Sequence, residues 1–430
     1  MSADAPDEAS SEGENDDDPP GRVITGPVRR FMVARFSVAA AFQIQGVAVG
    51  WYIYALTGSP LYLGFVGLAM FLPAASLALV AGQIIDRYPR RRVLLAAWSL
   101  QALSASGIAI LALIGRGSVE FVFLLIACFG AGRAFDQPAQ ASLLPSLVPV
   151  AQFPRVTPLN SLVNQFAVII GPGLGGLLFS AGEWLFKLGA PVAFCGTVVM
   201  YLVGLAAVAS LPQTPTRPAE PFSFRSFLSG IDFIRRAAAV RGAITLDMFG
   251  VFFGGATALL PIFARDILMI GPIGLGLLRS TPAMGALAAG LYLARHPLER
   301  HVGRRMFFAV AVYGLATIAF GLSRSLPLSI AALVIIGAAD VVSVVVRSTL
   351  VQTATPDAIR GRVSAVNSLF VGTSNQLGEF ESGVTADWFG AVGSVVLGGV
   401  ATLVVVAIAS NRFPALRRMD RFIMAPSEAD

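Results

Sequence analysis

The sequence predicts an all-α membrane protein that crosses the bilayer many times, and three observations support this class. Hydrophobic residues make up 55% of the 430 residues and charged residues 13%, about half of the roughly 25% charged residues found in soluble domains. The mean hydropathy is +0.73. Many apolar runs reach the approximately 20 residues that a membrane helix needs. Because a bilayer offers no hydrogen-bond partner, each spanning segment must satisfy its own backbone groups, as a helix does.

We expect twelve transmembrane helices, one for each apolar segment. These run over residues 30–56, 60–84, 91–115, 118–143, 157–180, 188–211, 240–264, 272–295, 304–323, 326–350, 362–386 and 390–411. Most arginines lie in the even-numbered connections between segments, and few lie in the odd-numbered ones. Because loops rich in Arg and Lys stay in the cytoplasm, the sequence predicts that both termini are cytoplasmic.

The segments divide the chain into five parts. Residues 1–27 are acidic and polar, which predicts a disordered cytoplasmic tail. Residues 28–211 form a predicted N-terminal six-helix bundle, and residues 240–411 a C-terminal one. Between them, residues 212–239 form a cytoplasmic linker with apolar residues at helical spacing, typical of an amphipathic helix at the membrane surface or of a plain helical linker. Residues 412–430 form a cytoplasmic tail.

The two halves of the chain repeat each other in parallel. The Asn-Ser-Leu of residues 160–162 recurs 207 positions later at 367–369. Nearer the start of each half, SPLYLG at 59–64 matches GPIGLG at 271–276, 212 positions later. Repeats of this kind in membrane proteins place a substrate site between two halves that rock against each other.

The loop after the second segment carries a motif of small, acidic and basic residues. It contains Gly82, Asp86, Arg87, Arg90 and Arg91. It resembles the G-x-x-x-D-R-x-G-R-R motif of the major facilitator superfamily, with Pro89 in place of the usual glycine. An aspartate at a helix end can pair with arginines or cap a neighbouring helix. We therefore expect this loop to hold the cytoplasmic helix ends together in one state, although its charges also serve topology.

The fifth segment contains a second motif, built from Gly171, Pro172, Gly175 and Gly176. It resembles the G-P-x-x-G-G motif associated with antiporters of the same superfamily. Proline removes a backbone donor and can kink a helix, and small residues let a neighbouring helix approach closely.

Together the segments, the repeat and the two motifs resemble the major facilitator superfamily over essentially the whole membrane part. QPAQASLLPSLVP followed by GPGLGG, with GEFESG in the second half, looks like the bacterial enterobactin-exporter and macrolide-efflux (transmembrane secretion effector) group. The resemblance implies two pseudo-symmetric six-helix bundles in a bacterial inner membrane. It also implies export of a siderophore-like or drug-like molecule by alternating access, in exchange for protons.

Charged residues within the predicted helices are the candidates for proton coupling or substrate binding, because each costs about 3 kcal/mol at mid-helix. The candidates are Glu379, Glu381, Asp340, Asp247, Arg133, Arg35 and Asp136. Arg133 lies 207 positions before Asp340, and Arg35 lies 212 before Asp247. We hypothesise that these groups form charge pairs within or across the halves; alternatively, Arg35 and Asp247 only reach the membrane interface. Asp136 follows Arg133 by three residues, which predicts a local ion pair.

Glu379 and Glu381 are two residues apart and therefore point about 200° apart around a helix. One of them is expected to face the central cavity, where a carboxylate removed from water can load and release a proton. The alternative is that both only hydrogen-bond to neighbouring helices.

The sequence gives no support for an enzymatic function. There is no ATP-binding glycine-rich loop and only one lysine, Lys187, and no spacing typical of a metal site or of a catalytic nucleophile. We expect no catalytic residue, metal or cofactor. The expected partners are a small-molecule substrate, protons or another coupling ion, and lipid, with no nucleic acid, for a monomeric protein. Two other functions stay open: import or facilitated passage of a small metabolite, and a receptor or scaffold that does not transport.

Overall fold

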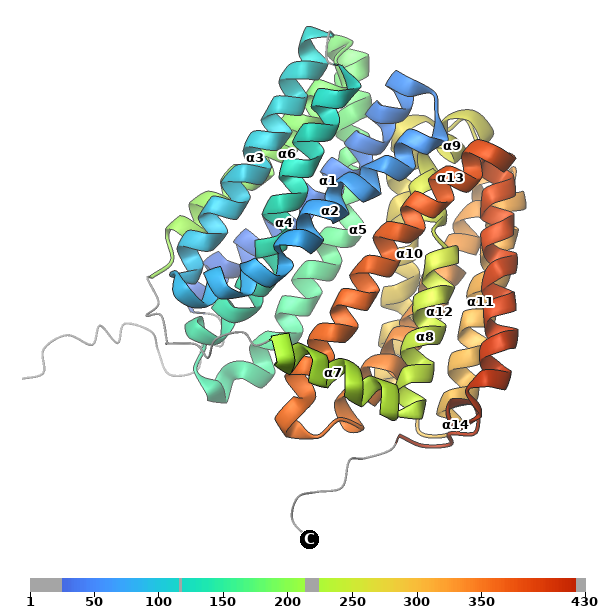
Figure 1. Cartoon of the computed structure of the whole chain (residues 1–430). Coiled ribbons are helices and arrows are strands. Elements are labelled where there is room, and N and C mark those ends of the chain that lie inside the picture. Colours follow the sequence, from blue (N-terminus) through green and yellow to red (C-terminus); the bar gives the residue numbers. More distant parts are fainter. Residues whose placement is uncertain (1–24, 116–117, 213–223, 423–430) are drawn as a thin grey trace, which may run out of the picture.

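The computed structural model describes residues 25–115, 118–212 and 224–422, and within these ranges the chain is helical with no strand. Most of the predicted acidic tail lies outside the described residues. Figure 1 shows the first half of the chain (blue to green) on one side of the molecule and the second half (yellow to red) on the other.

The first half consists of six long helices. They are α1 (Gly26–Thr57), α2 (Pro60–Arg87), α3 (Arg90–Ile114), α4 (Val119–Leu147), α5 (Phe153–Phe186) and α6 (Gly189–Ala209), with a short 3₁₀ turn, η1 (Val150–Gln152), before α5. Glycines in the left-handed conformation end two of them, Gly58 after α1 and Gly115 after α3, with φ of 64° and 66°. Pro60 then starts α2, where the missing N–H costs nothing.

The second half is less regular. Its elements are α8 (Ala238–Phe253), η2 (Ala256–Leu259), α9 (Leu260–Ile262), η3 (Phe263–Ile267), α10 (Gly271–Arg295), α11 (Val302–Leu322), α12 (Leu326–Thr353), α13 (Asp357–Arg412) and α14 (Pro414–Arg417). The predicted segment 240–264 corresponds to α8 through η3, so it is a broken helix. α13 contains Gly390 in a non-helical conformation, with φ 75° and ψ 162°. This glycine separates the predicted segments 362–386 and 390–411.

Nine helical stretches of the described residues are long and apolar enough to cross a membrane. The all-α membrane fold is therefore confirmed, and the number twelve stays a prediction. The boundaries agree closely: the segment predicted at 60–84 is the helix Pro60–Arg87, and that predicted at 326–350 is Leu326–Thr353.

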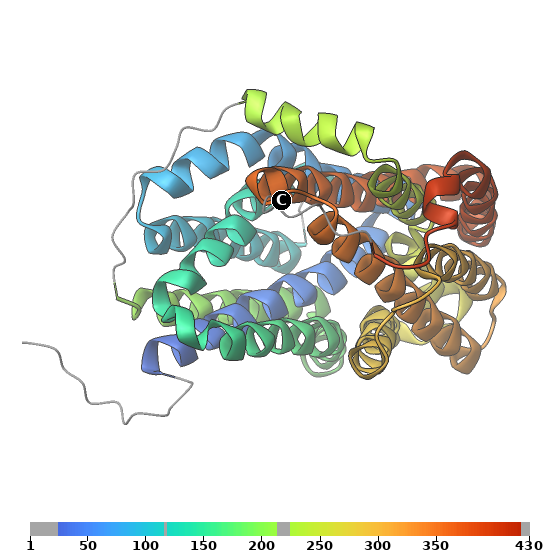
Figure 2. The same cartoon turned by 90° about the horizontal axis from the view of Figure 1, so that it is seen from below.

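The helices pack mainly within their own half. α1 packs against α5 and α6, α2 against α4, α10 against α12, and α11 against α12 and α13. The halves meet where α2 packs on α13 and α5 on α10. Helix α7 (Phe224–Arg236) lies across the lower end of the molecule against α13 (Figures 1 and 2). Ile234 of α7 is buried there.

The repeat in the sequence is a repeat in three dimensions. A Cβ atom added to Gly130 of α4 would lie 2.4 Å from the carbonyl oxygen of Met70 in α2. One added to Gly337 of α12 would lie 1.8 Å from the carbonyl oxygen of Pro282 in α10. Gly337 follows Gly130 by 207 positions and Pro282 follows Met70 by 212, so the same backbone contact occurs in both halves. We call positions related by these two offsets equivalent positions.

The halves also contact each other through glycines at equivalent positions. A Cβ atom on Gly383 of α13 would lie 2.5 Å from the Cα of Gly64 in α2. One on Gly276 of α10 would lie 2.4 Å from the carbonyl oxygen of Pro172 in α5. Small residues permit these backbone approaches. Both contacts lie toward the end of the bundle that contains the α1–α2 loop, which the arginine distribution predicts to be extracellular.

These close contacts predict a position-dependent effect of adding one methyl group in α10. Gly285→Ala places a Cβ 2.0 Å from the carbonyl oxygen of Val334, and we expect this overpacking to lower the free energy of unfolding by about 1–3 kcal/mol. Gly290→Ala in the same helix meets no atom within 4 Å and is expected to be neutral or slightly stabilising. Thermal unfolding of the purified variants checks this, and equal melting temperatures would contradict it.

Candidate functional site

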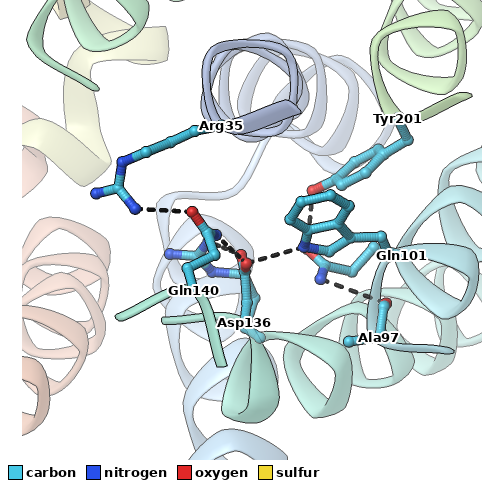
Figure 3. A network of polar contacts seen from close by, with 8 residues as sticks. Arg35, Ala97, Gln101, Asp136, Gln140 and Tyr201 are labelled. Carbon is cyan, nitrogen blue, oxygen red and sulfur yellow. Dashed lines mark hydrogen bonds and ion pairs between the residues drawn. The ribbon is translucent and has the colours of Figure 1, made fainter. Parts of the chain in front are cut away.

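The first polar cluster, here called the N-half network, lies among α1, α3 and α4 (Figure 3). Its members are Arg35, Trp98, Arg133, Asp136 and Gln140. Asp136 is fully buried and accepts hydrogen bonds from Trp98 Nε1 at 2.9 Å, from Arg133 at 2.7 Å and from Gln140. Arg35 donates to Gln140 Oε1 at 2.7 Å. Beside this cluster, Tyr201 donates to Gln101 at 2.8 Å.

The ion pair predicted from the spacing of Arg133 and Asp136 is present. The Arg133 side chain is 22% exposed and its guanidinium lies 4.1 Å from the centre of the Phe42 ring, a favourable cation–π geometry. Arg35 differs, because its hydrogen-bond partner is the neutral amide of Gln140. Asp136 is thus held by three donors, whereas the charge of Arg35 is not matched by a contacting carboxylate in the described residues.

The second cluster, the C-half network, joins α8, α12 and α13. Its members are Asp247, Asp340, Ser343, Arg347 and Asn367. Arg347 Nε lies 3.1 Å from Asp247 Oδ2, and only 6% and 5% of these side chains are exposed. Ser343 donates to Asp247 at 2.7 Å, and Arg347 donates to Asn367 at 2.9 Å. Asp340 lines a small cavity with Asp247 and Ser343, and it forms no hydrogen bond or ion pair with the described part of the chain.

The hypothesis allowed charge pairs within or across the halves, and this structure shows pairs within the halves. Arg35 does not contact Asp247, and Arg133 does not contact Asp340, among the described residues. Each charge that is paired is paired inside its own half, Arg133 with Asp136 and Arg347 with Asp247. The reason is the packing of the helices: α4 and α12 each pack against helices of their own half, so partners are available there first.

A central cavity of about 70 Å³ lies between the halves. It is lined by α1, α2 and α4 from one half and by η2, α9, α10 and α13 from the other. Its polar lining includes Gln45, Thr257, Arg279, Gln376 and Glu379. The volume holds a few water molecules and is well below the 300–1,000 Å³ typical of ligand pockets, so a substrate would require the halves to separate.

Arg279 and Glu379 enter this cavity next to glycines of the opposite half. Arg279 Nη1 donates to the carbonyl oxygen of Gly46 at 3.1 Å. A Cβ atom on Gly67 would lie 2.9 Å from Glu379 Oε2. Glu379 forms no hydrogen bond or ion pair within the described ranges. The Oε1 atoms of Gln45 and Gln376 are buried without a hydrogen-bond partner.

The structure separates the two glutamates of α13. Glu379 lines the central cavity, whereas Glu381 is half-buried and is not among the described residues that line it. The difference follows from the angle of about 200° between positions two apart on a helix.

The loop motif after α2 does not form the predicted latch in this conformation. Asp86 and Arg87 are exposed, and Asp86 has no hydrogen bond or ion pair to the described residues. Arg91 instead donates to the carbonyl oxygens of Ala209 and Leu211 at the end of α6, the latter at 2.7 Å. Arg90 lies at the start of α3, and a Cβ atom added to Gly82 would meet no atom within 4 Å. Among the described residues, the end of α2 that carries this loop therefore has no partner helix for Asp86 to cap.

The motif in α5 forms a contact surface rather than a break, because α5 is continuous through Pro172. Gly171 and Gly175 face α1, where added Cβ atoms would lie 2.6 Å from Gln43 Cβ and 3.1 Å from Ile44 Cα. Gly176 faces α10, where an added Cβ would lie 2.4 Å from the carbonyl oxygen of Pro272. The motif thus packs α5 against α1 of its own half and against α10 of the other half.

A further contact between the halves lies at the predicted extracellular end. The Tyr54 hydroxyl of α1 donates to Asp266 of η3, and Arg265 Nη1 donates to the carbonyl oxygen of Tyr54 at 3.3 Å. The Arg265 guanidinium also lies 5.4 Å from the centre of the Tyr54 ring. Tyr54 and Asp266 occupy equivalent positions, 212 residues apart.

Several of these residues were not candidates from the sequence. Gln140, Ser343, Gln45 and Gln376 are uncharged and carry no signal by themselves. The repeat could have found two of them, because Gln140 is equivalent to Arg347 and Asp136 to Ser343, each 207 positions apart. Arg279 and Arg347 were visible as charges in apolar segments, but no motif gave them a role.

A comparison with protein families matches residues 28–429 to the family described as transmembrane secretion effector. The chain belongs to this family of the major facilitator superfamily. The match covers both halves, the linker and both motifs.

Known relatives of this transmembrane secretion effector are consistent with the family. The enterobactin exporter EntS of Shigella boydii serotype 18 is 27% identical over 379 residues, which cover 87% of this chain and 85% of that protein. A bacterial homologue of the human lysosomal transporter Spinster, solved in an inward-facing, unoccupied conformation, has a TM-score of 0.71 at 15% identity and covers 93% and 98% of the two chains. A bacterial homologue of the iron transporter ferroportin, solved in an inward-facing state, has a TM-score of 0.67 at 15% identity, with 91% and 99% covered. This chain is therefore a multi-pass membrane transporter with the major facilitator fold.

The buried ion pair of the C-half network predicts a large effect of removing one charge. Arg347→Gln leaves Asp247 buried without its cation and near Asp340, and we expect it to destabilise the protein by about 3–5 kcal/mol. Adding Asp247→Asn to Arg347→Gln removes the uncompensated charge and is expected to recover much of this loss. Unfolding of the purified variants in detergent measures both.

The exposed ion pair of α7 provides a matched control. Arg236 and Asp232 lie 2.6 Å apart with 80% and 56% of their side chains exposed. Arg236→Gln is expected to change stability by less than about 1 kcal/mol. If Arg347→Gln has no larger effect than Arg236→Gln, the C-half pair is not a structural ion pair.

Proposed function

We propose that this transporter is a secondary active exporter that moves a small amphiphilic molecule out of the cytoplasm in exchange for protons. The observation that carries the proposal is Glu379, an acidic side chain in the cavity between the halves that lacks a hydrogen-bonding partner in the described residues. The protein would act in a bacterial inner membrane with both termini in the cytoplasm, as the arginine distribution predicts.

Glu379 has the position that a proton carrier needs. It lies between the two halves, against Gly67 of the first and on α13 of the second, so a movement of the halves changes its surroundings. Arg279 lines the same cavity and interacts with Glu379 electrostatically, at a distance beyond that of an ion pair. If Glu379 releases its proton when it contacts the substrate or Arg279, proton movement would be coupled to substrate movement. Asp340 forms no hydrogen bond or ion pair in the described residues but interacts electrostatically with Asp247 and Arg347, and it is the second candidate.

The contacts between the halves support a state that is open toward the cytoplasm. The Tyr54–Asp266 contact and the glycine contacts Gly64–Gly383 and Gly276–Pro172 all lie toward the predicted extracellular end. The Spinster and ferroportin homologues with this fold are both described as inward-facing. In the state open to the outside we expect the cytoplasmic ends of the two halves to meet. Asp86 of the loop motif could then cap the end of a neighbouring helix.

The likeness to EntS supports an amphiphilic substrate, of which enterobactin is the first example to test. A thermal-shift screen of the purified protein against catecholate siderophores, macrolides and lysophospholipids would choose the substrate for transport assays.

The proton exchange is tested by Glu379→Gln in inside-out vesicles with an acidic lumen. We expect the wild-type protein to accumulate the substrate in the lumen, and Glu379→Gln to reduce this gradient-driven accumulation by about tenfold or more. Exchange of labelled for unlabelled substrate without a gradient should persist, because it requires no net proton movement.

Glu381→Gln is the matched control, since it changes the same residue type two positions away but outside the cavity lining. It is expected to leave accumulation within about twofold of wild type, which is less than 0.5 kcal/mol. Normal gradient-driven accumulation by Glu379→Gln would refute its role. Accumulation in the lumen only when the lumen is alkaline would instead favour an importer, in which protons and substrate move in the same direction.

A further inference from the structure

The N-half and C-half networks occupy equivalent positions with their charges reversed. Arg35 is equivalent to Asp247, Arg133 to Asp340, Asp136 to Ser343 and Gln140 to Arg347. The contacts are equivalent too: position 35 contacts position 140 at 2.7 Å, and position 247 contacts position 347 at 3.1 Å. The first network contains two cations and one anion, and the second contains two anions and one cation. The same framework therefore has a positive surplus in one half and a negative surplus in the other.

The positive surplus of the N-half network resides on Arg35. Arg133 is paired with the only carboxylate, Asp136, which Trp98 and Gln140 also contact. Arg35 reaches only the amide oxygen of Gln140, and its Nε is buried without a hydrogen-bond partner. At the equivalent contact in the other half, Arg347 neutralises Asp247 directly. Arg35 has no such contact: the charge of Asp136 acts on it from a distance, and Asp136 itself contacts Arg133.

Arg35 lies within α1 rather than in its first turn. It lies nine residues after the start of α1 at Gly26, about 14 Å along the helix axis. A cation within a membrane helix is costly unless it is paired or faces a cavity. Its side chain is part-exposed, although its Nε is buried. Figure 3 shows it on the side of the network away from Tyr201 and Gln101.

We propose that the N-half network is a binding site for the anionic headgroup of the transported molecule, with Arg35 as its main cationic contact and Arg133 as a second. The class of ligand is an amphiphile with a carboxylate or another acidic oxygen group, which would supply the contacting anion that Arg35 lacks among the described residues. Guanidinium groups suit such groups because they donate two parallel hydrogen bonds. This inference rests on the proposed transport function and assigns its substrate class: the first half recognises the anion, and the acidic surplus of the second half is left for the coupling cation.

The experiment compares an acid with its neutral amide. Binding of N-lauroylglycine and of N-lauroylglycinamide to the full chain, in nanodiscs of zwitterionic phosphatidylcholine, is measured by isothermal titration. We expect wild type to prefer the acid, and Arg35→Gln to weaken acid binding by about 10- to 100-fold, as for a hydrogen bond to a charged group. Binding of the amide should change less than about twofold, which also shows that the variant is folded.

Two further variants sharpen the result. Arg35→Lys keeps the charge and should retain most of the preference for the acid, with some loss because a lysine cannot bind in the two-pronged manner. Arg324→Gln removes an exposed arginine from the loop before α12 and should bind both ligands as wild type does. Equal binding of acid and amide by wild type, or an unchanged preference in Arg35→Gln, would overturn the proposal.

The outcome is separable from that of the vesicle experiment. If Arg35→Gln binds the acid normally while Glu379→Gln still abolishes gradient-driven accumulation, only the anion site is wrong. If Arg35 controls acid binding and Glu379→Gln transports normally, the anion site stands and proton exchange at Glu379 is wrong.

Discussion

Charged side chains inside membrane helices need a partner, and this requirement organises the interior of the transporter. In each half a buried aspartate is the centre of a network: Asp136 is held by an arginine, a tryptophan and a glutamine, and Asp247 by an arginine and a serine. These bonds tie α4 to α1 and α3, and α12 to α8 and α13. Because each half satisfies its own buried aspartate, it can move as a unit without exposing that charge to lipid.

Movement between the halves depends on a different kind of surface. The interface between α2 and α13 and that between α5 and α10 are built on glycines whose backbones touch. At these glycines the backbones approach closely, and beside them Phe65 of α2 contacts Phe380 of α13 and Gln165 of α5 donates to the carbonyl oxygen of Ala283 in α10. The polar residues Arg279 and Glu379 lie beside these contacts in a cavity with room for only a few waters. The site thus combines two internally paired halves, close backbone contacts between them, and the carboxylate of Glu379 beside those contacts.

The sequence predicted those features that depend on local pattern. Helix positions followed from the length of the apolar runs, because lipid requires a continuous apolar stretch, and the Arg133–Asp136 pair followed from spacing within one helix. Features that depend on how helices cross were not predictable. Asp86 was expected to pair or to cap a helix in one state, and it is exposed in this one. Arg35 was expected to form a charge pair or to reach the membrane interface, and its hydrogen-bond partner is Gln140. Only the packing of α13 against α2 distinguishes Glu379 from Glu381. The broken helix from α8 to η3 was also missed, since its composition is as apolar as that of its neighbours.

The contact between Tyr54 and Asp266 has a consequence for the history of the fold. These two side chains hold equivalent positions in the two halves, and yet they touch each other, so they lie close to the axis that relates the halves. If the halves were identical, each residue at this point would meet its own copy: two aspartates would repel, and two tyrosines would lack the carboxylate acceptor. A donor can face an acceptor here only because the halves differ. Divergence of the halves therefore permits the Tyr54–Asp266 hydrogen bond. It also permits the opposite net charges of the N-half and C-half networks, a difference that two identical subunits could not have.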